Sequence, residues 1–153
     1  MQREPGVVET TVGYTGGTTE RPTHEEVAGR GSGHVEAVEV RYDPVRTSFE
    51  QLAKLFFETH DPTGPEGQTP SPEKRSQSAI FVVDDGQKKT AEKLIGELKA
   101  RGQNVVTAVA PAGRFWPAEP LHQDYYAKKG GQPPCSVRKR LWAPSRAEAG
   151  GAK

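Results

Sequence analysis

Apolar and polar residues alternate with a period of two in VVETTVGY (7 to 14) and again in GHVEAVEVRYD (33 to 43). Successive side chains of a strand point to opposite faces, so this alternation predicts two strands that each have one mainly apolar face. The Gly- and Thr-rich segment between them predicts a loop with one helical turn at residues 22 to 27, where Thr23 and Glu26 form a capping box. The predicted faces hold Val8, Thr10, Val12 and Tyr14 in the first strand, and Glu36, Val38, Val40 and Tyr42 in the second.

Two later segments carry apolar residues at helical spacing, which predicts helices at about residues 49 to 59 and 87 to 101. Ser48 and Gln51 form a capping box for the first helix, and Gly102 ends the second. We expect the first apolar stripe to pack on a sheet. The stripes consist of Phe49, Leu52, Ala53, Phe56 and His60 in the first helix, and of Ala91, Leu94, Ile95 and Leu98 in the second.

Short apolar runs at residues 78 to 85 and 105 to 111 predict two further strands. The Pro-rich segment 60 to 76 has no period and predicts a long loop, and the chain after the last strand predicts an irregular arm with a disordered tail at residues 143 to 153. Strand and helix thus alternate in two β-α-β units. This order predicts an α+β fold, a two-layer α/β sandwich of ferredoxin-like type with helices on one face of a mixed sheet.

Composition narrows the classes of protein to which this chain can belong. The chain has 153 residues, enough for one domain with a real core, and its 17 Gly and 13 Pro predict long ordered loops. A formal net charge of +1 argues against a protein that binds nucleic acid or an anionic membrane surface. No apolar run approaches the roughly 18 residues of a membrane span, and the N-terminus lacks a signal-peptide core, so we predict a cytoplasmic protein. The single cysteine, Cys135, excludes an internal disulfide.

Glu36 is the leading candidate for chemistry. It shares its predicted strand face with apolar residues, where an ionised carboxylate is costly unless it is paired. Two interpretations stay open: a protonated acid that donates from the end of a buried strand, or a carboxylate at the strand mouth that points into water.

The other candidate motifs are weaker. GYTGG (13 to 17) is not followed by a helix, as a phosphate-binding loop requires, and predicts a tight turn. The four histidines and Cys135 match no zinc spacing, so we predict no metal site and no cofactor. HDP (60 to 62) predicts a turn. The aromatic segments FWPAE (115 to 119) and HQDYY (122 to 126) either line a pocket or pack structurally.

Several motifs occur together, in a fixed order, along nearly the whole chain. They are PGVVETTVGYTGGTTERPTHEEV, GHVEAVEVRYDP, FFETHDPT, SAIFV, FWPAEPLHQDYYAKKGGQP and a Cys shortly after the last of them. From about Pro5 to Trp142 the sequence therefore resembles the A-type peptide methionine sulfoxide reductases. No single motif is specific, but the set is.

The resemblance implies reduction of methionine S-sulfoxide, in proteins or as the free amino acid. In that family a cysteine attacks the sulfoxide sulfur while a glutamate of the GHxEAV motif protonates the oxygen. A second cysteine near the C-terminus converts the resulting sulfenic acid to a disulfide, which thioredoxin reduces. Glu36 takes the acid position, Cys135 the position of the resolving cysteine, and His24 and Ser76 take substrate-binding positions that are tyrosines in the family.

The family nucleophile lies in a GCFWG motif that precedes the segment matched from Pro5 onward. We therefore expect residues 1 to 142 to form an N-terminally incomplete reductase domain, without the first strand and the helix start, and with an exposed strand edge. Ser71 also replaces a family aspartate. Two other hypotheses remain open: a non-catalytic relative that binds methionine-bearing peptides or partners, and a reductase in which Cys135 itself is the nucleophile.

Overall fold

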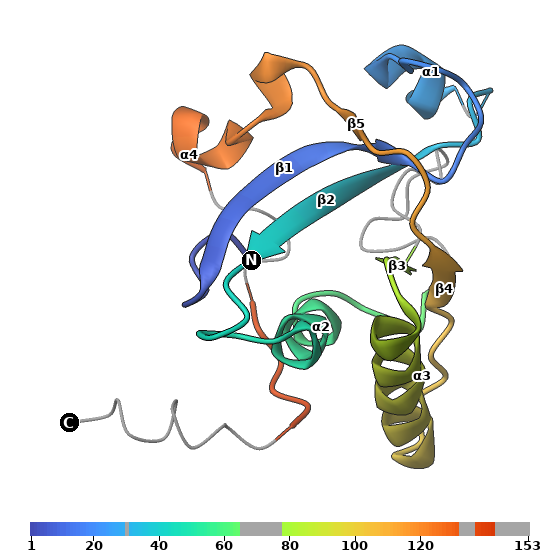
Figure 1. Ribbon diagram of the computed structural model, residues 1–153, viewed down its shortest axis with the longest axis vertical. Helices are drawn as coiled ribbons and strands as arrows, with labels where there is room; N and C mark the ends of the chain where they lie inside the picture. Colours follow the sequence, from blue (N-terminus) through green and yellow to red (C-terminus); the bar gives the residue numbers. More distant parts are fainter. Residues whose placement is uncertain (30, 65–77, 132–136, 143–153) are drawn as a thin grey trace.

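The computed structural model describes residues 1–29, 31–64, 78–131 and 137–142. In Figure 1 a long, curved β-hairpin lies above two helices, and the short helices α1 and α4 lie beyond the hairpin. The elements follow in the order β1 (Val7–Thr15), α1 (His24–Ala28), β2 (Val35–Tyr42), α2 (Phe49–Glu58), β3 (Ala79–Val82), α3 (Asp85–Ala100), β4 (Ala108–Pro111), β5 (Trp116–Pro117), the 3-10 helix η1 (Pro120–His122) and α4 (Tyr125–Lys129).

The two N-terminal strands and the short strand β5 form an antiparallel sheet of three strands. Its order is β2-β1-β5, and the pairing of β1 with β2 places Tyr14 opposite Glu36. Gly13 lets β5 approach, because a Cβ atom there would lie 2.3 Å from the carbonyl oxygen of Trp116. This close approach brings the segment after β5 to the same end of the sheet as Glu36.

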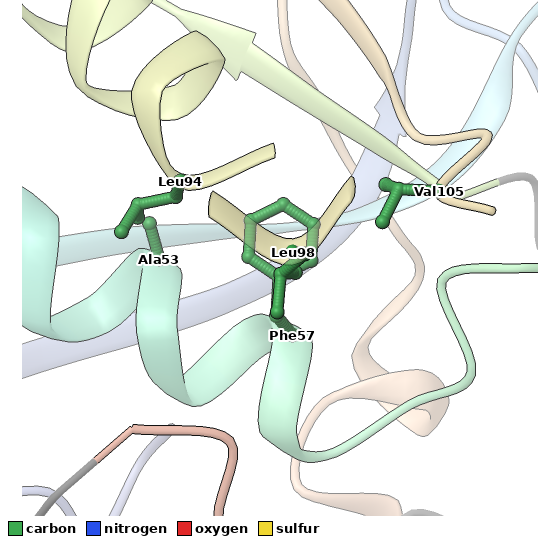
Figure 2. Close-up of a cluster of buried hydrophobic side chains, with 5 residues drawn as sticks. All are labelled: Ala53, Phe57, Leu94, Leu98 and Val105. Carbon is green, nitrogen blue, oxygen red and sulfur yellow. The ribbon is translucent and has the colours of Figure 1, made fainter. Parts of the chain in front are cut away.

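The helices α2 and α3 enclose the larger core, which Figure 2 shows. Phe57 of α2 and Leu94 and Leu98 of α3 are almost completely buried, at 1%, 0% and 0% exposure, and Ala53 and Val105 complete the cluster. Ser48 caps α2 by accepting the N–H of Gln51, but the predicted capping box is only half formed, because Gln51 Oε1 accepts the hydroxyl of Thr47 instead. The α2 stripe packs mainly on α3 and reaches the parallel β3–β4 pair through Ile80.

A second, smaller core fixes α1 to the antiparallel sheet. Val27 of α1 packs with Tyr14 of β1 and with Ala118, which follows β5, and all three are at most 7% exposed. The predicted capping box is present, because the Thr23 hydroxyl accepts the N–H of Glu26 while the Glu26 carboxylate accepts the N–H of Thr23. The first residue of α1, His24, is thereby held at the edge of the hairpin.

The end of the described chain is anchored on the buried carboxylate of Glu58, which is 2% exposed. Its oxygens accept from Arg138 Nε at 2.5 Å, from the N–H of Leu141 at 3.0 Å and from the N–H of Trp142 at 3.3 Å. The Trp142 ring packs on Phe57 with ring centroids 6.3 Å apart. The segment from Arg138 to Trp142 is therefore fixed to α2, and its Leu141 and Trp142 pack against the α2–α3 core.

The α+β class is confirmed, with antiparallel and parallel pairings in two separate sheets among the described residues. The prediction that one face of β2 lies in an apolar core is wrong, because Val38 on that face is 51% exposed. β3 ends at Val82, earlier than predicted, because Asp84 caps α3 by accepting the N–H of Gln87.

The later part of the chain differs from the prediction in two further ways. β4 begins at Ala108, three residues later than predicted, and the arm predicted to be irregular forms β5, η1 and α4. The predicted disordered tail, residues 143 to 153, lies outside the described residues. None of the helices in the part that is described is long and apolar enough to cross a membrane.

Candidate functional site

Five polar side chains meet where β1 ends, α1 begins, β2 begins and the chain passes from β5 into η1. Tyr14 donates a hydrogen bond to Glu119. The ring of His24 stacks on that of His122, and His24 also lies close to Glu36. Tyr14 and Glu119 are 105 positions apart in the sequence, so only the tertiary fold brings them together.

Tyr14 and Glu119 form one end of this cluster, where Tyr14 is buried and the Glu119 side chain is 38% exposed. The Tyr14 hydroxyl donates to Glu119 Oε2 at 2.8 Å, and the Tyr14 side chain is only 2% exposed. Burial raises the pKa of Tyr14 well above its usual range, and the hydrogen bond and the charge of Glu119 add to the shift. Tyr14 therefore stays a protonated donor at any physiological pH.

Glu119 is held as a carboxylate by the donors around it. Its own backbone N–H lowers its pKa most, and the Tyr14 hydroxyl, the backbone N–H of His24 and the nearby His122 act in the same direction, against the opposing effect of desolvation. Glu119 Oε1 accepts the N–H of His24 at 3.1 Å. This contact ties the start of α1 to the segment between β5 and η1.

The two imidazoles lie face to face. The rings of His24 and His122 stack with centroids 4.8 Å apart and an angle of 25° between their planes. His122 Nε2 is 3.9 Å from Glu119 Oε2, and His24 Nε2 is 3.4 Å from Glu36 Oε1. A continuous row of ionisable groups thus runs from Glu119 to Glu36.

Glu36 lies at the other end of this row. Its side chain is 37% exposed, which supports the interpretation of a carboxylate at the strand mouth rather than one enclosed in an apolar core. Tyr14 is its partner across the strand pair, and His24 lies on its other side. A carboxyl group that is held by neighbours yet open to solvent can exchange a proton with a bound molecule.

Buried contacts of His34 hold the loop that carries α1. Its Nδ1 accepts the N–H of Gly17 at 3.1 Å, its Nε2 lies 2.8 Å from the carbonyl oxygen of Thr19, and its ring is 6% exposed. Because Nδ1 is an acceptor, Nε2 carries the proton and the ring is neutral. A cavity beside this loop is lined by Thr19, Glu26, Gly29, Gly31 and Ser32.

Of the site residues predicted from sequence, the structure brings His24 and Glu36 together, while Ser76 and Cys135 lie outside the described residues. Sequence reasoning did not single out Tyr14, Glu119 or His122. The available signals were the position of Tyr14 on the same predicted strand face as Val12, and the aromatic segments around Glu119 and His122. Within the described ranges, no group of three or more His, Cys, Asp or Glu residues is arranged to hold a metal ion.

Comparison with known proteins gives one consistent result. A family model described as peptide methionine sulfoxide reductase matches residues 1–149. The peptide methionine sulfoxide reductase MsrA of Nocardia farcinica is 48% identical over 128 residues, which make up 82% of this chain and 73% of that protein.

Solved structures agree with the sequence matches. Methionine sulfoxide reductase A of Corynebacterium diphtheriae is similar with a TM-score of 0.72 at 33% identity, over 86% of this chain and 68% of that one. Mxr1 from Saccharomyces cerevisiae in its reduced form gives a TM-score of 0.79 at 26% identity, over 88% and 78% of the two chains. Mxr1 in complex with Trx2 gives 0.51 at 24% identity, over 78% and 67%, a likeness of fold alone.

Proposed function

The chain belongs to the peptide methionine sulfoxide reductase family, and we propose that Glu36 is the acid that protonates the sulfoxide oxygen of its substrate. Its reaction is the thiol-dependent reduction of methionine S-sulfoxide, in proteins or as the free amino acid. Such reduction reverses the oxidation of methionine, which turns a flexible apolar side chain into a polar one.

The chemistry needs one proton and two electrons at the sulfoxide. A thiolate sulfur attacks the substrate sulfur, and the oxygen takes up a proton and passes to the attacking sulfur. The products are the thioether and a sulfenic acid, so the substrate sulfur gains the two electrons that the thiol sulfur loses. A second thiol then displaces water from the sulfenic acid and forms a disulfide.

The position of Glu36 is the observation that supports this assignment most. Its carboxyl group is 37% exposed, so a substrate oxygen can reach it, while Tyr14 across the strand pair and His24 at 3.4 Å limit its movement. The Tyr14 side chain is itself fixed, because its hydroxyl donates to Glu119. Protonation of the oxygen makes the sulfur more electrophilic, which is the role of a general acid in this reaction.

The remaining assignments rest on the resemblance. We assign His24 and Ser76 to substrate binding and Cys135 to the position of the resolving cysteine. We further propose that thioredoxin or another thiol reductant returns the disulfide to the thiol state, as the complex of Mxr1 with Trx2 illustrates for the yeast protein. A cytoplasmic location is part of the same proposal.

The test is reduction of a methionine sulfoxide peptide with dithiothreitol. We expect Glu36→Gln to lower kcat/KM by roughly a hundredfold or more, the usual contribution of a general acid. Glu39→Gln is the matched control, because Glu39 lies on the other face of the same strand and is exposed. Equal activity of the two variants would contradict the acid role of Glu36.

Two further variants test which thiol attacks the substrate and which thiol resolves the sulfenic acid. The printed sequence contains no GCFWG, so the assay is run on this chain and on the chain joined at its N-terminus to a segment with that motif. With the motif present, Cys135→Ser is expected to keep the first turnover and to block the thioredoxin-dependent steps. Loss of the first turnover in Cys135→Ser would instead make Cys135 the attacking thiol.

A further inference from the structure

Glu119 connects the two residues that flank Glu36. Its carboxylate uses both oxygens, because Oε2 accepts the Tyr14 hydroxyl at 2.8 Å and Oε1 accepts the backbone N–H of His24 at 3.1 Å. Tyr14 is the cross-strand partner of Glu36, and His24 Nε2 lies 3.4 Å from Glu36 Oε1. One side chain from the segment between β5 and η1 thus holds both neighbours of the proposed acid.

The bond to Tyr14 fixes the first neighbour of Glu36. Directly opposed residues of an antiparallel strand pair have Cβ atoms about 4.5–5.5 Å apart on the same face of the sheet. The Tyr14 side chain is 2% exposed, and its hydroxyl donates to Glu119, so the ring cannot turn away without leaving a buried donor unpaired. The side chain of Glu36 therefore has a rigid ring beside it.

The bond to His24 fixes the second neighbour. His24 is the first residue of α1, and its N–H is one of the donors for which a helix has no internal acceptor. Glu119 supplies that acceptor, although it stands at the N-terminus of η1, where its side chain makes no capping hydrogen bond. The His24 ring also stacks on His122, with centroids 4.8 Å apart, and is thereby held beside Glu36.

We propose that Glu119 is a positioning residue for Glu36. The inference rests on the proposed acid role of Glu36 and adds the group that orients the acid. The Glu36 side chain is 37% exposed, and a side chain with that much access to solvent occupies several staggered rotamers unless its neighbours restrict it. Glu119 acts through Tyr14 and His24, so it orients the acid without being a catalytic residue.

The orientation of Glu36 matters for the rate of the chemical step. A general acid must lie about 2.6–3.2 Å from the atom that it protonates, and a displacement of about 1 Å can lower the rate by roughly a hundredfold. The loss of Glu119 should therefore lower kcat more than it changes KM.

Gln123 provides a matched control on the same segment. Its amide oxygen accepts the N–H of Val12 at 2.9 Å, and its amide N–H₂ donates to the carbonyl oxygen of Val12 at 2.8 Å. Val12 pairs with Val38 and not with Glu36. Gln123→Ala therefore removes hydrogen bonds between β1 and the segment after β5, but it leaves both contacts of Glu119 in place.

The first experiment measures the orientation of Glu36 on the full chain and needs no turnover. Three-bond NMR couplings from the backbone nitrogen and the carbonyl carbon of Glu36 to its Cγ give the populations of its χ1 rotamers. We expect one rotamer in the wild type and in Gln123→Ala, and a mixture of staggered rotamers in Glu119→Ala. A single rotamer in Glu119→Ala, or a mixture in the wild type or in Gln123→Ala, would overturn the proposal.

A milder variant covers the case in which Glu119→Ala does not fold. The carboxylate of Glu119→Asp is one methylene shorter, so we expect it to reach only one of its two donors. This variant should also give a mixture of Glu36 rotamers, and a single rotamer would count against the proposal in the same way.

The second experiment is the peptide reduction assay. We expect Glu119→Ala to lower kcat roughly tenfold or more with little change in KM, and Gln123→Ala to keep both values near those of the wild type. Thermal melts of the two variants compare their stabilities. An equal fall of kcat in the two variants would mean that a general loss of structure is the cause, and the positioning role would be rejected.

The outcomes separate this inference from the proposed function. A single Glu36 rotamer in Glu119→Ala, together with an inactive Glu36→Gln variant, would keep Glu36 as the acid and remove Glu119 as its positioning residue. A mixture of rotamers in Glu119→Ala, together with a fully active Glu36→Gln variant, would keep the positioning contact and remove the acid role.

Discussion

Glu58→Gln is expected to destabilise the fold strongly, because this substitution removes the charge that anchors residues 138 to 142. The Glu58 carboxylate is 2% exposed and accepts Arg138 Nε at 2.5 Å and two backbone N–H groups at 3.0 and 3.3 Å. An amide at this position keeps one acceptor oxygen but turns an N–H₂ group toward donors. The backbone bond from Lys139 N–H to the Glu58 carbonyl, at 2.7 Å, is retained.

The magnitude follows from the number of contacts and their burial. Removing one partner of a buried ion pair generally costs about 3–5 kcal/mol. Arg138 is 29% exposed, and its charge can turn toward water, so we expect the lower end, about 3 kcal/mol. For a chain of this size that loss corresponds to a fall in Tm of roughly 6–12 °C.

Thermal unfolding measures this loss directly. The control is Glu50→Gln on the same helix, where Glu50 pairs with Lys54 at 2.7 Å but is 38% exposed. An exposed pair of this spacing contributes only about 0.3–0.5 kcal/mol, so this variant should melt within about 2 °C of the wild type. If Glu58→Gln melts at the same temperature as Glu50→Gln, the anchoring role of Glu58 is refuted.

Three other changes test the contacts that shape the site and the core. Gly17→Ala would place a Cβ atom 2.3 Å from the Ser32 carbonyl oxygen, so we expect a loss of about 1–3 kcal/mol in a chemical denaturation, whereas Gly31→Ala, with open space around it, should be nearly neutral. Tyr14→Phe removes the hydroxyl that donates to Glu119 at 2.8 Å and should cost about 1.5–3 kcal/mol of unfolding free energy in the same experiment, which a variant as stable as the wild type would contradict. Burial lowers the pKa of His60, so the folded state binds its proton less readily than the unfolded chain; the contribution is complete above about pH 6.5 and is lost as the pH falls through the folded pKa. The Tm of the wild type should therefore fall more steeply between pH 7 and pH 5 than that of His60→Gln, and parallel curves would show that His60 does not contribute.

Local signals in the sequence predicted most of the elements correctly. The alternation in residues 7 to 14 and the helical period behind Ser48 predicted β1 and α2 closely, because caps and periodicity act over a few neighbouring residues. The short β5 has no such signal. It forms because Gly13 on β1 admits the backbone of Trp116, a contact between segments about 100 positions apart.

Burial was harder to predict than secondary structure. The period-two pattern placed Val38 in the core, yet it is 51% exposed, because the pattern specifies which residues share a face but not what covers that face. The reverse error concerns Glu58, which has the residue type of a solvent-exposed position and is 2% exposed. Only the return of the chain at Arg138 supplies the charge and the N–H groups that make its burial possible.

The candidate site shows the same division between local and long-range information. Glu36 was identifiable because a carboxylate in an apolar alternation is unusual, and His24 because the segment around it matches a family motif. The groups that give these two residues their chemistry, Glu119 and His122, come from the arm that was predicted to be irregular. No pattern in that arm predicts that the ring of His122 lies on His24, since the stacking depends on the β5 pairing that turns the arm back across β1. The row of side chains from Glu36 to Glu119 is therefore a property of the fold, and histidine at position 24 is its one member that a local motif could locate.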